Sequence, residues 1–259
     1  MKLRFMGTGT SFGIPVLGCD CRVCRSGDPR DRRTRHSALI ELDGGRLLVD
    51  TPPEIRLQLL EAGPGPVDAV WYTHAHADHI HGIDDLRAYT ALRSHPVEVF
   101  VPQGSAPLFR QRFSYIFDKS VRPEAGTSKP TLDLIELDPD EPVSICGSEF
   151  RPLPVPHGPL TVFGFRVGAL GYITDAKRLP TIVKERLAGV RVLVLNALWL
   201  GNPHPTHFNV EEAVSAASEI GAERTYLTHL THRVSHEQLL DYLPEGIEPA
   251  YDGLDVEIP

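Results

Sequence analysis

Three histidines and one aspartate lie within one short segment of the chain, Thr73-His74-Ala75-His76-Ala77-Asp78-His79. The segment directly follows the apolar residues Ala69–Tyr72, which predict a strand, so all four side chains leave the same strand end. Histidines two apart in a turn can reach one metal ion, while Asp78 and His79 can reach a second ion ~3.5–4 Å away. Imidazole nitrogen and carboxylate oxygen suit zinc, manganese or iron. The alternative is a solvated histidine-rich loop.

Three of the four cysteines crowd into a second short segment, at Cys19, Cys21 and Cys24. This spacing offers three thiolates, one short of the four ligands that structural tetrahedral zinc normally takes. It is a poor framework for disulfides, and the alternative is a group of buried or reactive thiols. Cys146 lies far away in the sequence and is interpreted as an ordinary thiol. A second metal site is therefore expected near the N-terminus.

Runs rich in Val, Ile, Leu and aromatic residues predict the strands that must position these groups. The predicted strands are Leu3–Met6, Ala38–Leu42, Arg46–Asp50, Ala69–Thr73, Val97–Val101, Phe150–Val155, Thr161–Val167, Gly171–Thr174, Val190–Leu195 and Thr225–Thr228. Helices are predicted over Pro53–Ala62, Pro180–Ala188, Asn209–Gly221 and Ser235–Tyr242. Hairpins early in each half, followed by helices, favour two packed sheets with helices outside.

The 259 residues carry 26 Lys and Arg against 34 Asp and Glu, a formal charge of −8. No run approaches the ~20 apolar residues of a membrane helix, and Met1–Phe5 lacks the apolar region of a secretory signal. We therefore expect a cytoplasmic protein with a single domain over 1–259. The acidic balance gives no electrostatic footprint for binding duplex nucleic acid.

The residues from His74 to His79 match the H-x-H-x-D-H motif, so the sequence resembles the metallo-β-lactamase superfamily. The resemblance implies an α/β fold, a four-layer αββα sandwich with one or two metal ions at the edge of its sheets. It also implies three further ligands, each after a predicted strand: His157, Asp175 and His229. The first ion would take His74, His76 and His157, the second would take Asp78, His79 and His229, and Asp175 would bridge them.

Two such cations lower the pKa of a shared water, so that hydroxide exists near neutral pH, and they hold the centre that it attacks. Hydrolysis is therefore the expected reaction, with Asp78 among the catalytic residues. Asp50, at the end of Arg46–Asp50, is expected to accept a hydrogen bond from a ligand histidine, or simply to cap its strand.

The fourth ligand of the cysteine group is expected to be His232, three residues after His229, which completes a structural zinc site. Together with Thr8-Gly9-Thr10-Ser11, this pairing narrows the resemblance to the PhnP-type cyclic phosphodiesterase group, over essentially the whole chain. Such relatives hydrolyse phosphodiesters, including ribosyl 1,2-cyclic phosphate and 2′,3′-cyclic nucleotides. The resemblance therefore implies a small phosphodiester substrate, and a homodimer, since dimers are common in this group.

His207 stands just before the helix predicted from Asn209. Relatives that cleave phosphodiesters have a histidine in this place, which contacts phosphate and protonates the leaving oxygen. Because an alkoxide leaves poorly, an imidazole poised there is useful as a general acid. His204 is the rival for this role, and its placement relative to the helix favours His207.

Two further segments could contact a substrate, one basic and one containing glycines. The segment Arg22–Arg35 is rich in arginine and could bind a second phosphate or a short nucleic acid, or be solvated. Residues Gly7–Gly13 could offer backbone N–H groups to phosphate.

Three other functions use the same ligands. A thioester, lactone or β-lactam hydrolase would keep the metals and need no acid at His207. A nuclease on RNA or DNA ends is disfavoured by the acidic balance and by the lack of a long Gly-rich arm. A non-catalytic zinc protein would hold one metal ion per chain, although all seven expected ligands are present.

Overall fold

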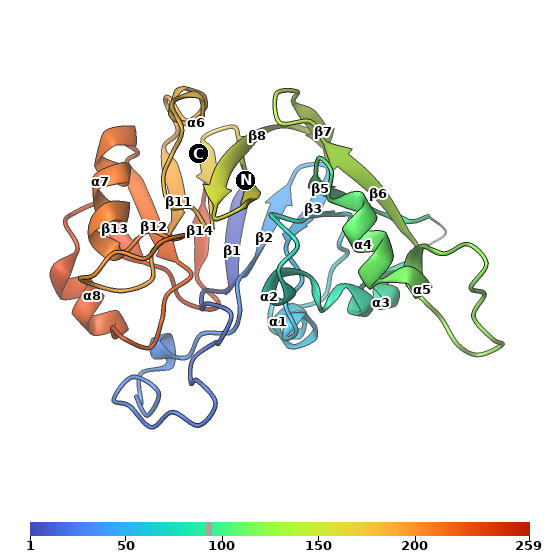
Figure 1. Ribbon diagram of the computed structural model, residues 1–259, viewed down its shortest axis with the longest axis horizontal. Coiled ribbons are helices and arrows are strands. Elements are labelled where there is room, and N and C mark those ends of the chain that lie inside the picture. The colour runs from blue at the N-terminus through green and yellow to red at the C-terminus, as the bar shows by residue number, and fades with distance from the viewer. Residues whose placement is uncertain (92–94) are drawn as a thin grey trace.

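The computed structural model describes residues 1–91 and 95–259, and its strands form two seven-stranded sheets (Figure 1). In pairing order, the first sheet is β14 (Asp255–Glu257), β1 (Lys2–Gly7), β2 (Ser37–Leu42), β3 (Gly45–Val49), β4 (Ala69–Trp71), β5 (Val97–Pro102) and β6 (Leu132–Leu137). The second is β13 (Ile247–Pro249), β12 (Arg224–Thr228), β11 (Val192–Asn196), β10 (Leu170–Tyr172), β9 (Leu160–Val167), β8 (Ser148–His157) and β7 (Val143–Ile145). Each sheet is antiparallel on one side and parallel on the other.

Helices cover the outer face of each sheet (Figure 1). On the first sheet lie α1 (Ile55–Glu61), α2 (Ala77–Ile80), α3 (Arg87–Ala91), α4 (Ala106–Arg112) and α5 (Ser114–Phe117), with the 3-10 turn η2 (Ile83–Leu86). On the second lie α6 (Thr181–Arg186), α7 (Val210–Ile220) and α8 (His236–Tyr242). Among the described residues, no helix combines the length and the apolar character needed to cross a bilayer.

The apolar core lies in three layers, which makes the fold the expected αββα sandwich. One cluster fills the space between the sheets, and one lies under the helices on either side. Trp71 of β4 joins the two sheets, because its Nε1 donates to the carbonyl of Phe163 in β9 at 2.8 Å. Its ring also meets that of Phe165 edge-on, with centroids 5.1 Å apart. The prediction of fold class is therefore confirmed.

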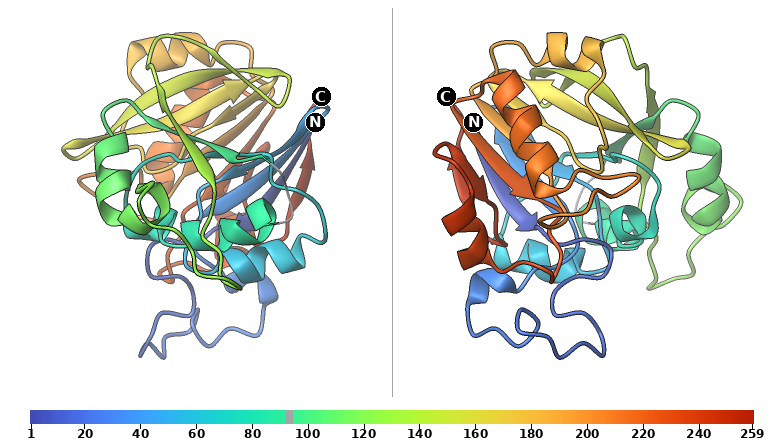
Figure 2. Two further views of the ribbon diagram at one scale, coloured as in Figure 1. Left: turned by 90° about the vertical axis from the view of Figure 1, so that its right-hand side faces the viewer. Right: turned by 60° about the vertical axis from the view of Figure 1, so that its left-hand side comes forward.

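A long loop between β1 and β2 projects from one end of the sandwich (Figures 1 and 2). It contains the 3-10 turn η1 (Pro29–Asp31) and the three clustered cysteines. The two chain ends lie side by side at the other end, where the Ile258 amide donates to the Met1 carbonyl at 2.8 Å (Figure 2). The first and last strands of the chain thus share one sheet.

The ten strands predicted from the sequence are present, with ends that differ by one or two residues. Three of them end earlier than predicted: β3, β4 and β10 stop at Val49, Trp71 and Tyr172, just before polar residues of the site. The capping signals at Asn209 and Ser235 are confirmed, since both form capping boxes at the starts of α7 and α8. The four strands that were not predicted, β6, β7, β13 and β14, are the four sheet edges.

Candidate active site

The metal-ligating side chains predicted from the sequence meet at one end of the sandwich, on loops that leave the ends of strands. Three of the residues there adopt left-handed backbone conformations: Asp50 (φ 59°), Asp175 (φ 56°) and His229 (φ 59°). Residues other than glycine rarely adopt such angles, and strain of this kind concentrates at functional sites. Each of these residues closely follows a strand, β3, β10 or β12, so the sharp change of direction turns its side chain into the site.

His74, His76 and His157 form the first ligand group, in which one ring nitrogen from each lies within 4.8 Å of the others. His74 and His157 are buried, and His76 is exposed. The Nδ1 of His157 lies 3.2 Å from the Thr206 carbonyl, which can only accept, so this nitrogen carries the proton. The lone pair of His157 is then on Nε2, which is free to ligate.

Asp78, His79 and His229 form the second group. The Oδ2 of Asp78 lies 3.3 Å from His79 Nε2 and 3.9 Å from His229 Nε2. Asp175 reaches both histidines, with Oδ2 3.6 Å from His79 Nε2 and Oδ1 3.3 Å from His229 Nε2. It also groups with His74 and His79, so it lies between the two sets, as the bridging role requires.

Buried nitrogen atoms without partners show that these residues fit metal ions. Among the described residues, His79 Nε2 and His229 Nε2 have no hydrogen-bond partner, although both are buried. Leaving buried polar groups unsatisfied costs free energy, and native proteins seldom do so without another ligand. Two lone pairs aimed at carboxylates are satisfied by a divalent cation of the kind that imidazole and carboxylate ligands prefer.

Asp50 fixes the orientation of His79. Its Oδ2 accepts from His79 Nδ1 at 2.7 Å, and the backbone N–H and hydroxyl of Thr73 donate to its two oxygens, each at 2.9 Å. Burial alone would lower the pKa of His79, but the charges of Asp78, Asp50 and Asp175 outweigh burial and raise this pKa well above its usual value. The same carboxylates make the site negative and therefore attractive to cations.

His207 lies at the same site, and His204 lies further out. The Nε2 of His207 is 2.9 Å from Asp175 Oδ1, and its ring meets that of His157 edge-on, with centroids 4.6 Å apart. Burial lowers the pKa of His207, although its bond to Asp175 opposes this. The Nδ1 of His204 lies 3.2 Å from His207 Nδ1, on the side away from Asp175. The geometry therefore favours His207 for contact with a substrate.

Sequence reasoning missed His36, which is buried beside the site. Its Nε2 lies 3.1 Å from the Tyr172 hydroxyl and 3.9 Å from Asp50 Oδ2, and its ring centroid is 5.5 Å from that of His79. Burial lowers the pKa of His36 well below its usual value, so the ring is neutral. A single histidine before a strand carries no spacing signal, so nothing in the sequence pointed to it.

The structure brings the three clustered cysteines and His232 together. Cys19, Cys21 and Cys24 place their Sγ atoms 3.3, 3.5 and 3.4 Å from His232 Nδ1. The backbone N–H of Cys24 donates to Cys21 and lowers the pKa of that thiol to about 6, whereas burial raises the pKa of Cys24 to about 11. Three thiols and one imidazole nitrogen around a point have the donor set of a structural zinc site.

The structure gives less support to substrate binding by the arginine-rich segment and by the Gly7–Gly13 segment than to binding at the ligand groups. Most arginines of Arg22–Arg35 are already engaged: Arg25 pairs with Asp20 and Arg30 with Asp28, Arg35 pairs with Glu54, and Arg33 is buried against Thr8 and Ala250. In the Gly7–Gly13 segment, the amides of Thr8, Gly9, Thr10 and Gly13 donate to groups within the protein. These amides are therefore not free to bind phosphate.

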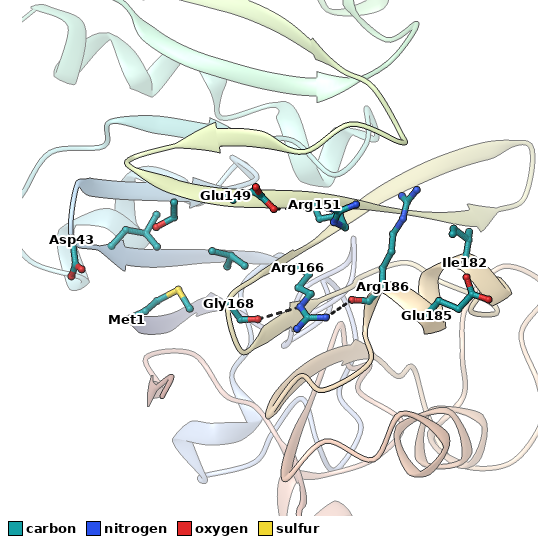
Figure 3. A pocket seen from close by; sticks show the side chains of 12 residues that line it. Met1, Asp43, Glu149, Arg151, Arg166, Gly168, Ile182, Glu185 and Arg186 are labelled. Atoms are coloured by element: carbon teal, nitrogen blue, oxygen red, sulfur yellow. Dashed lines mark hydrogen bonds and ion pairs between the residues drawn. The ribbon is translucent and has the colours of Figure 1, made fainter.

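A cavity of about 860 Å³ lies away from the ligand groups and is not the site of chemistry (Figure 3). It lies at the opposite ends of the strands, beside the last residue of β2 and the first residue of β8, whereas His157 is the last residue of β8. Its arginines are partly engaged, because Arg166 donates to the Gly168 and Arg186 carbonyls at 3.2 and 2.7 Å (Figure 3). No cluster of metal-ligating side chains in the described residues includes its lining.

The fold and the two ligand groups define a metal-dependent hydrolase. Residues 45–230 match the family model of the beta-lactamase superfamily domain. The crystal structure of a diphosphatase from the PhnP family is 38% identical and superposes with a TM-score of 0.90, over 98% of this chain and 96% of that one. The chain therefore belongs to the metallo-β-lactamase superfamily, and within it to the PhnP family.

Two other proteins are similar in different ways. An octanoyltransferase of Porphyromonas gingivalis is 39% identical over 260 residues, and the chain spans about half of that relative's length (52%). The zinc-bound PqqB of Methylobacterium extorquens is 21% identical, with a TM-score of 0.78 over 100% of both chains, which shows a shared fold.

Proposed function

We propose that this protein is a phosphodiesterase with two divalent ions, zinc or manganese, which hydrolyses a small and cyclic phosphodiester, and that a structural zinc ion supports it. The observation that carries the proposal is the position of His207. Its Nε2 lies 2.9 Å from the carboxylate of Asp175, at the meeting point of both ligand groups. A phosphate held there would have an imidazole beside its leaving oxygen.

The expected ligands form two sets of three, joined by one shared residue. His74, His76 and His157 would hold one ion, Asp78, His79 and His229 would hold the other, and Asp175 would contact both. Bound together, such ions supply a nucleophile derived from water at neutral pH and neutralise charge on the phosphate. Asp50 keeps His79 in the tautomer that leaves Nε2 free, because it accepts the proton of Nδ1 at 2.7 Å.

His207 would supply the proton that the leaving alkoxide needs. Thr206 Oγ1, 3.0 Å from His207 Nδ1, fixes the ring with Nε2 turned toward the ligands. Burial lowers the pKa of His207, which makes its protonated form a stronger acid. In a cyclic ester the leaving oxygen stays attached to the product sugar, so one proton transfer completes ring opening.

The test is the initial rate of hydrolysis of 2′,3′-cyclic AMP by metal-replete protein, beside the Asp78→Ala and His207→Ala variants. We expect the wild type to hydrolyse this substrate. Asp78→Ala should lose turnover, because the two ions no longer act together. His207→Ala should lose turnover while its metal content stays unchanged. An octanoyl thioester is assayed in parallel, because of the similarity to an octanoyltransferase. Hydrolysis of the thioester alone by the two-metal protein would overturn the proposal in favour of an acyl hydrolase.

A non-catalytic zinc protein would contain a different number of metal ions from the proposed enzyme. With the active-site ligands complete, we expect two ions there and one at the cysteine group. A single ion in the whole chain, with no hydrolysis of any ester, would contradict the proposed function.

A further inference from the structure

Asn196, the last residue of β11, is completely buried at the end of an interior strand of the second sheet. Its side-chain amide makes two hydrogen bonds, and both go to the backbone of Ala176. The Ala176 N–H donates to Asn196 Oδ1 at 2.7 Å, and Asn196 Nδ2 donates to the Ala176 carbonyl at 3.1 Å. A carboxamide is suited to this task, because it can accept and donate at the same time. The two bonds together fix one residue of the neighbouring loop against the strand end.

Ala176 directly follows Asp175, the residue expected to bridge the two ions. The backbone of Asp175 is left-handed, with φ of 56°, and residues other than glycine hold such angles only where the surrounding structure fixes them. The preceding strand, β10, ends at Tyr172, so Ala176 lies beyond the backbone ladder of the sheet. The bonds from Asn196 therefore hold the chain at the point where the direction of the Asp175 carboxylate is set.

The Ala176 carbonyl also holds the loop of the proposed acid. It accepts a second hydrogen bond, at 2.8 Å, from the backbone N–H of Phe208, the residue directly after His207. The side chains on this carbonyl's two neighbours meet in turn, since His207 Nε2 lies 2.9 Å from Asp175 Oδ1. One carbonyl group thus joins the backbone beside the bridging ligand to the backbone beside the acid, and Asn196 holds that carbonyl in place.

The neighbouring turn at His229 does not depend on the Asn196 side chain. The Ala197 N–H donates to the Thr228 carbonyl at 2.8 Å, so a main-chain bond holds the residue before His229. In residues 1–91 and 95–259, the side chain of Asn196 makes no hydrogen bond to a ligand side chain, because both of its bonds go to Ala176. A substitution at Asn196 therefore acts through Ala176 alone.

We propose that Asn196 is a positioning residue, which sets the Asp175 carboxylate and the His207 imidazole relative to each other by holding Ala176. The inference rests on the proposed phosphodiesterase function and adds a residue that touches neither ion nor substrate. Proton transfer from His207 depends closely on its distance from the leaving oxygen, and a misplacement of about 1 Å costs a reaction about 10²-fold in rate.

The first test is a double-mutant cycle between Asn196→Leu, which keeps the side-chain size and removes both bonds, and His207→Ala. In Asn196→Leu, kcat with 2′,3′-cyclic AMP should fall about 10²-fold while KM stays within about threefold. With bis(p-nitrophenyl) phosphate the loss should be at least about tenfold smaller, because nitrophenolate needs no proton from His207. In the His207→Ala background, Asn196→Leu should lower both rates by the same factor, since the acid through which it acts is gone.

The matched control is Gln58→Leu. Gln58 is also a buried carboxamide, and it donates to the Thr34 hydroxyl and the Arg35 carbonyl at 2.7 and 2.9 Å, under the first sheet. Its loss tests what a buried amide contributes to stability alone, so the wild-type ratio of the two rates should be kept. If Asn196→Leu does not fold, Asn196→Ala replaces it, because it loses the same two bonds without adding an apolar branch.

The second test measures metal retention and needs no turnover. Because Asn196 directs the expected bridging carboxylate, Asn196→Leu should release its active-site ions at about 10–100-fold lower chelator concentration than the wild type. The zinc ion of the cysteine group is the internal control and should be retained equally in both proteins. Gln58→Leu should retain all of its ions as the wild type does.

The outcomes separate the two proposals. If the wild type hydrolyses neither ester, while Asn196→Leu but not Gln58→Leu releases active-site ions more readily, the phosphodiesterase function fails and the positioning role toward Asp175 stands. If the wild type hydrolyses both esters, and Asn196→Leu keeps the wild-type ratio of rates and metal retention, the function stands and the positioning role is wrong. Equal effects of Asn196→Leu and Gln58→Leu on both readouts would also overturn it, because they would reduce Asn196 to a contribution to stability.

Discussion

Asp50 and His79 are 29 residues apart in the chain, yet the Oδ2 of Asp50 accepts the Nδ1 proton of His79 at 2.7 Å. Both side chains are completely buried, and Asp50 reaches this position from a left-handed backbone conformation, with φ of 59°. Two donors from Thr73 hold the other lone pairs of the carboxylate. The orientation of one expected metal ligand is therefore set from the neighbouring strand end.

Replacing Asp50 with Asn should weaken metal binding by about 10–100-fold. Asn adopts left-handed conformations readily, so the backbone is preserved. Its NH2 group, however, would face one of the three hydrogen-bond donors that now bind the carboxylate oxygens. The measurement is the metal content retained after dialysis against graded concentrations of a chelator. Wild-type retention in a folded variant would show that Asp50 only caps its strand.

The loss caused by His207→Ala should depend on the leaving group. We expect a fall of about 10²–10⁴-fold in kcat with 2′,3′-cyclic AMP, where an alkoxide must be protonated. With bis(p-nitrophenyl) phosphate the loss should be at least tenfold smaller, because nitrophenolate leaves without a proton. His204→Ala is the matched control and should lose less than His207→Ala with the cyclic nucleotide. Equal losses with both substrates would instead assign His207 to binding or to metal ligation.

Replacing Cys21 or Cys24 with Ser should remove one zinc ion per chain. Each thiol lies within 3.5 Å of His232 Nδ1, whereas Cys146 lies outside the group, so Cys146→Ser should keep the wild-type zinc content. Losing a structural ion costs a few kcal/mol or more, which in a chain of this size lowers the Tm by about 5–10 °C. Zinc is counted by emission spectroscopy and Tm by calorimetry. An unchanged zinc count would exclude the Cys3His site.

The free energy of unfolding should fall as the pH is lowered from 6.5 to 4, because of the titration of His236. Burial, together with the charges of Arg33 and Arg30, lowers the pKa of His236 to about 4, and Arg33 Nη2 lies 3.2 Å from its Nδ1. The unfolded chain takes up this proton near pH 6.5 and the folded chain only near pH 4. Stability is therefore fully present above pH 6.5 and is lost by about 3 kcal/mol as the pH falls toward 4.

The measurement for His236 is the difference in the free energy of unfolding between the wild type and His236→Asn, by urea denaturation at pH 7.5 and pH 4.5. Asn keeps an acceptor for Arg33 and does not titrate. Acid loss of metal affects both proteins alike, so the difference isolates His236. A difference that is the same at both pH values would contradict the assigned shift.

Some interior strands were predictable because both of their faces are buried and their sequences are continuous apolar runs, as in Val192–Asn196. The edge strands were not, since β7, β13 and β14 have three residues each and β6 carries Asp133 and Glu136 among its apolar residues. Short or charged edges limit pairing with other chains, and this also removes the apolar signal.

The site was predictable to different depths. The spacing of His74 to His79 carries a metal signal by itself, whereas His157, Asp175 and His229 are single polar residues after strands and came only from the family resemblance. The partners of the loop arginines were out of reach, because Arg35 pairs with Glu54 and Arg33 with the Ala250 carbonyl, far along the chain. Tertiary contacts of this kind have no local pattern.

The ligands are divided between the two sheets. His74, His76, Asp78 and His79 follow β4 of the first sheet. In the second sheet, His157 ends β8, and Asp175 and His229 follow β10 and β12. Either half alone therefore holds an incomplete set, and tight coordination requires that the halves have docked. Ions that bind only the docked form raise its stability by mass action, so metal binding and the docking of the two sheets are thermodynamically coupled. Scarcity of metal would then leave a chain that is folded but more readily opened between its sheets.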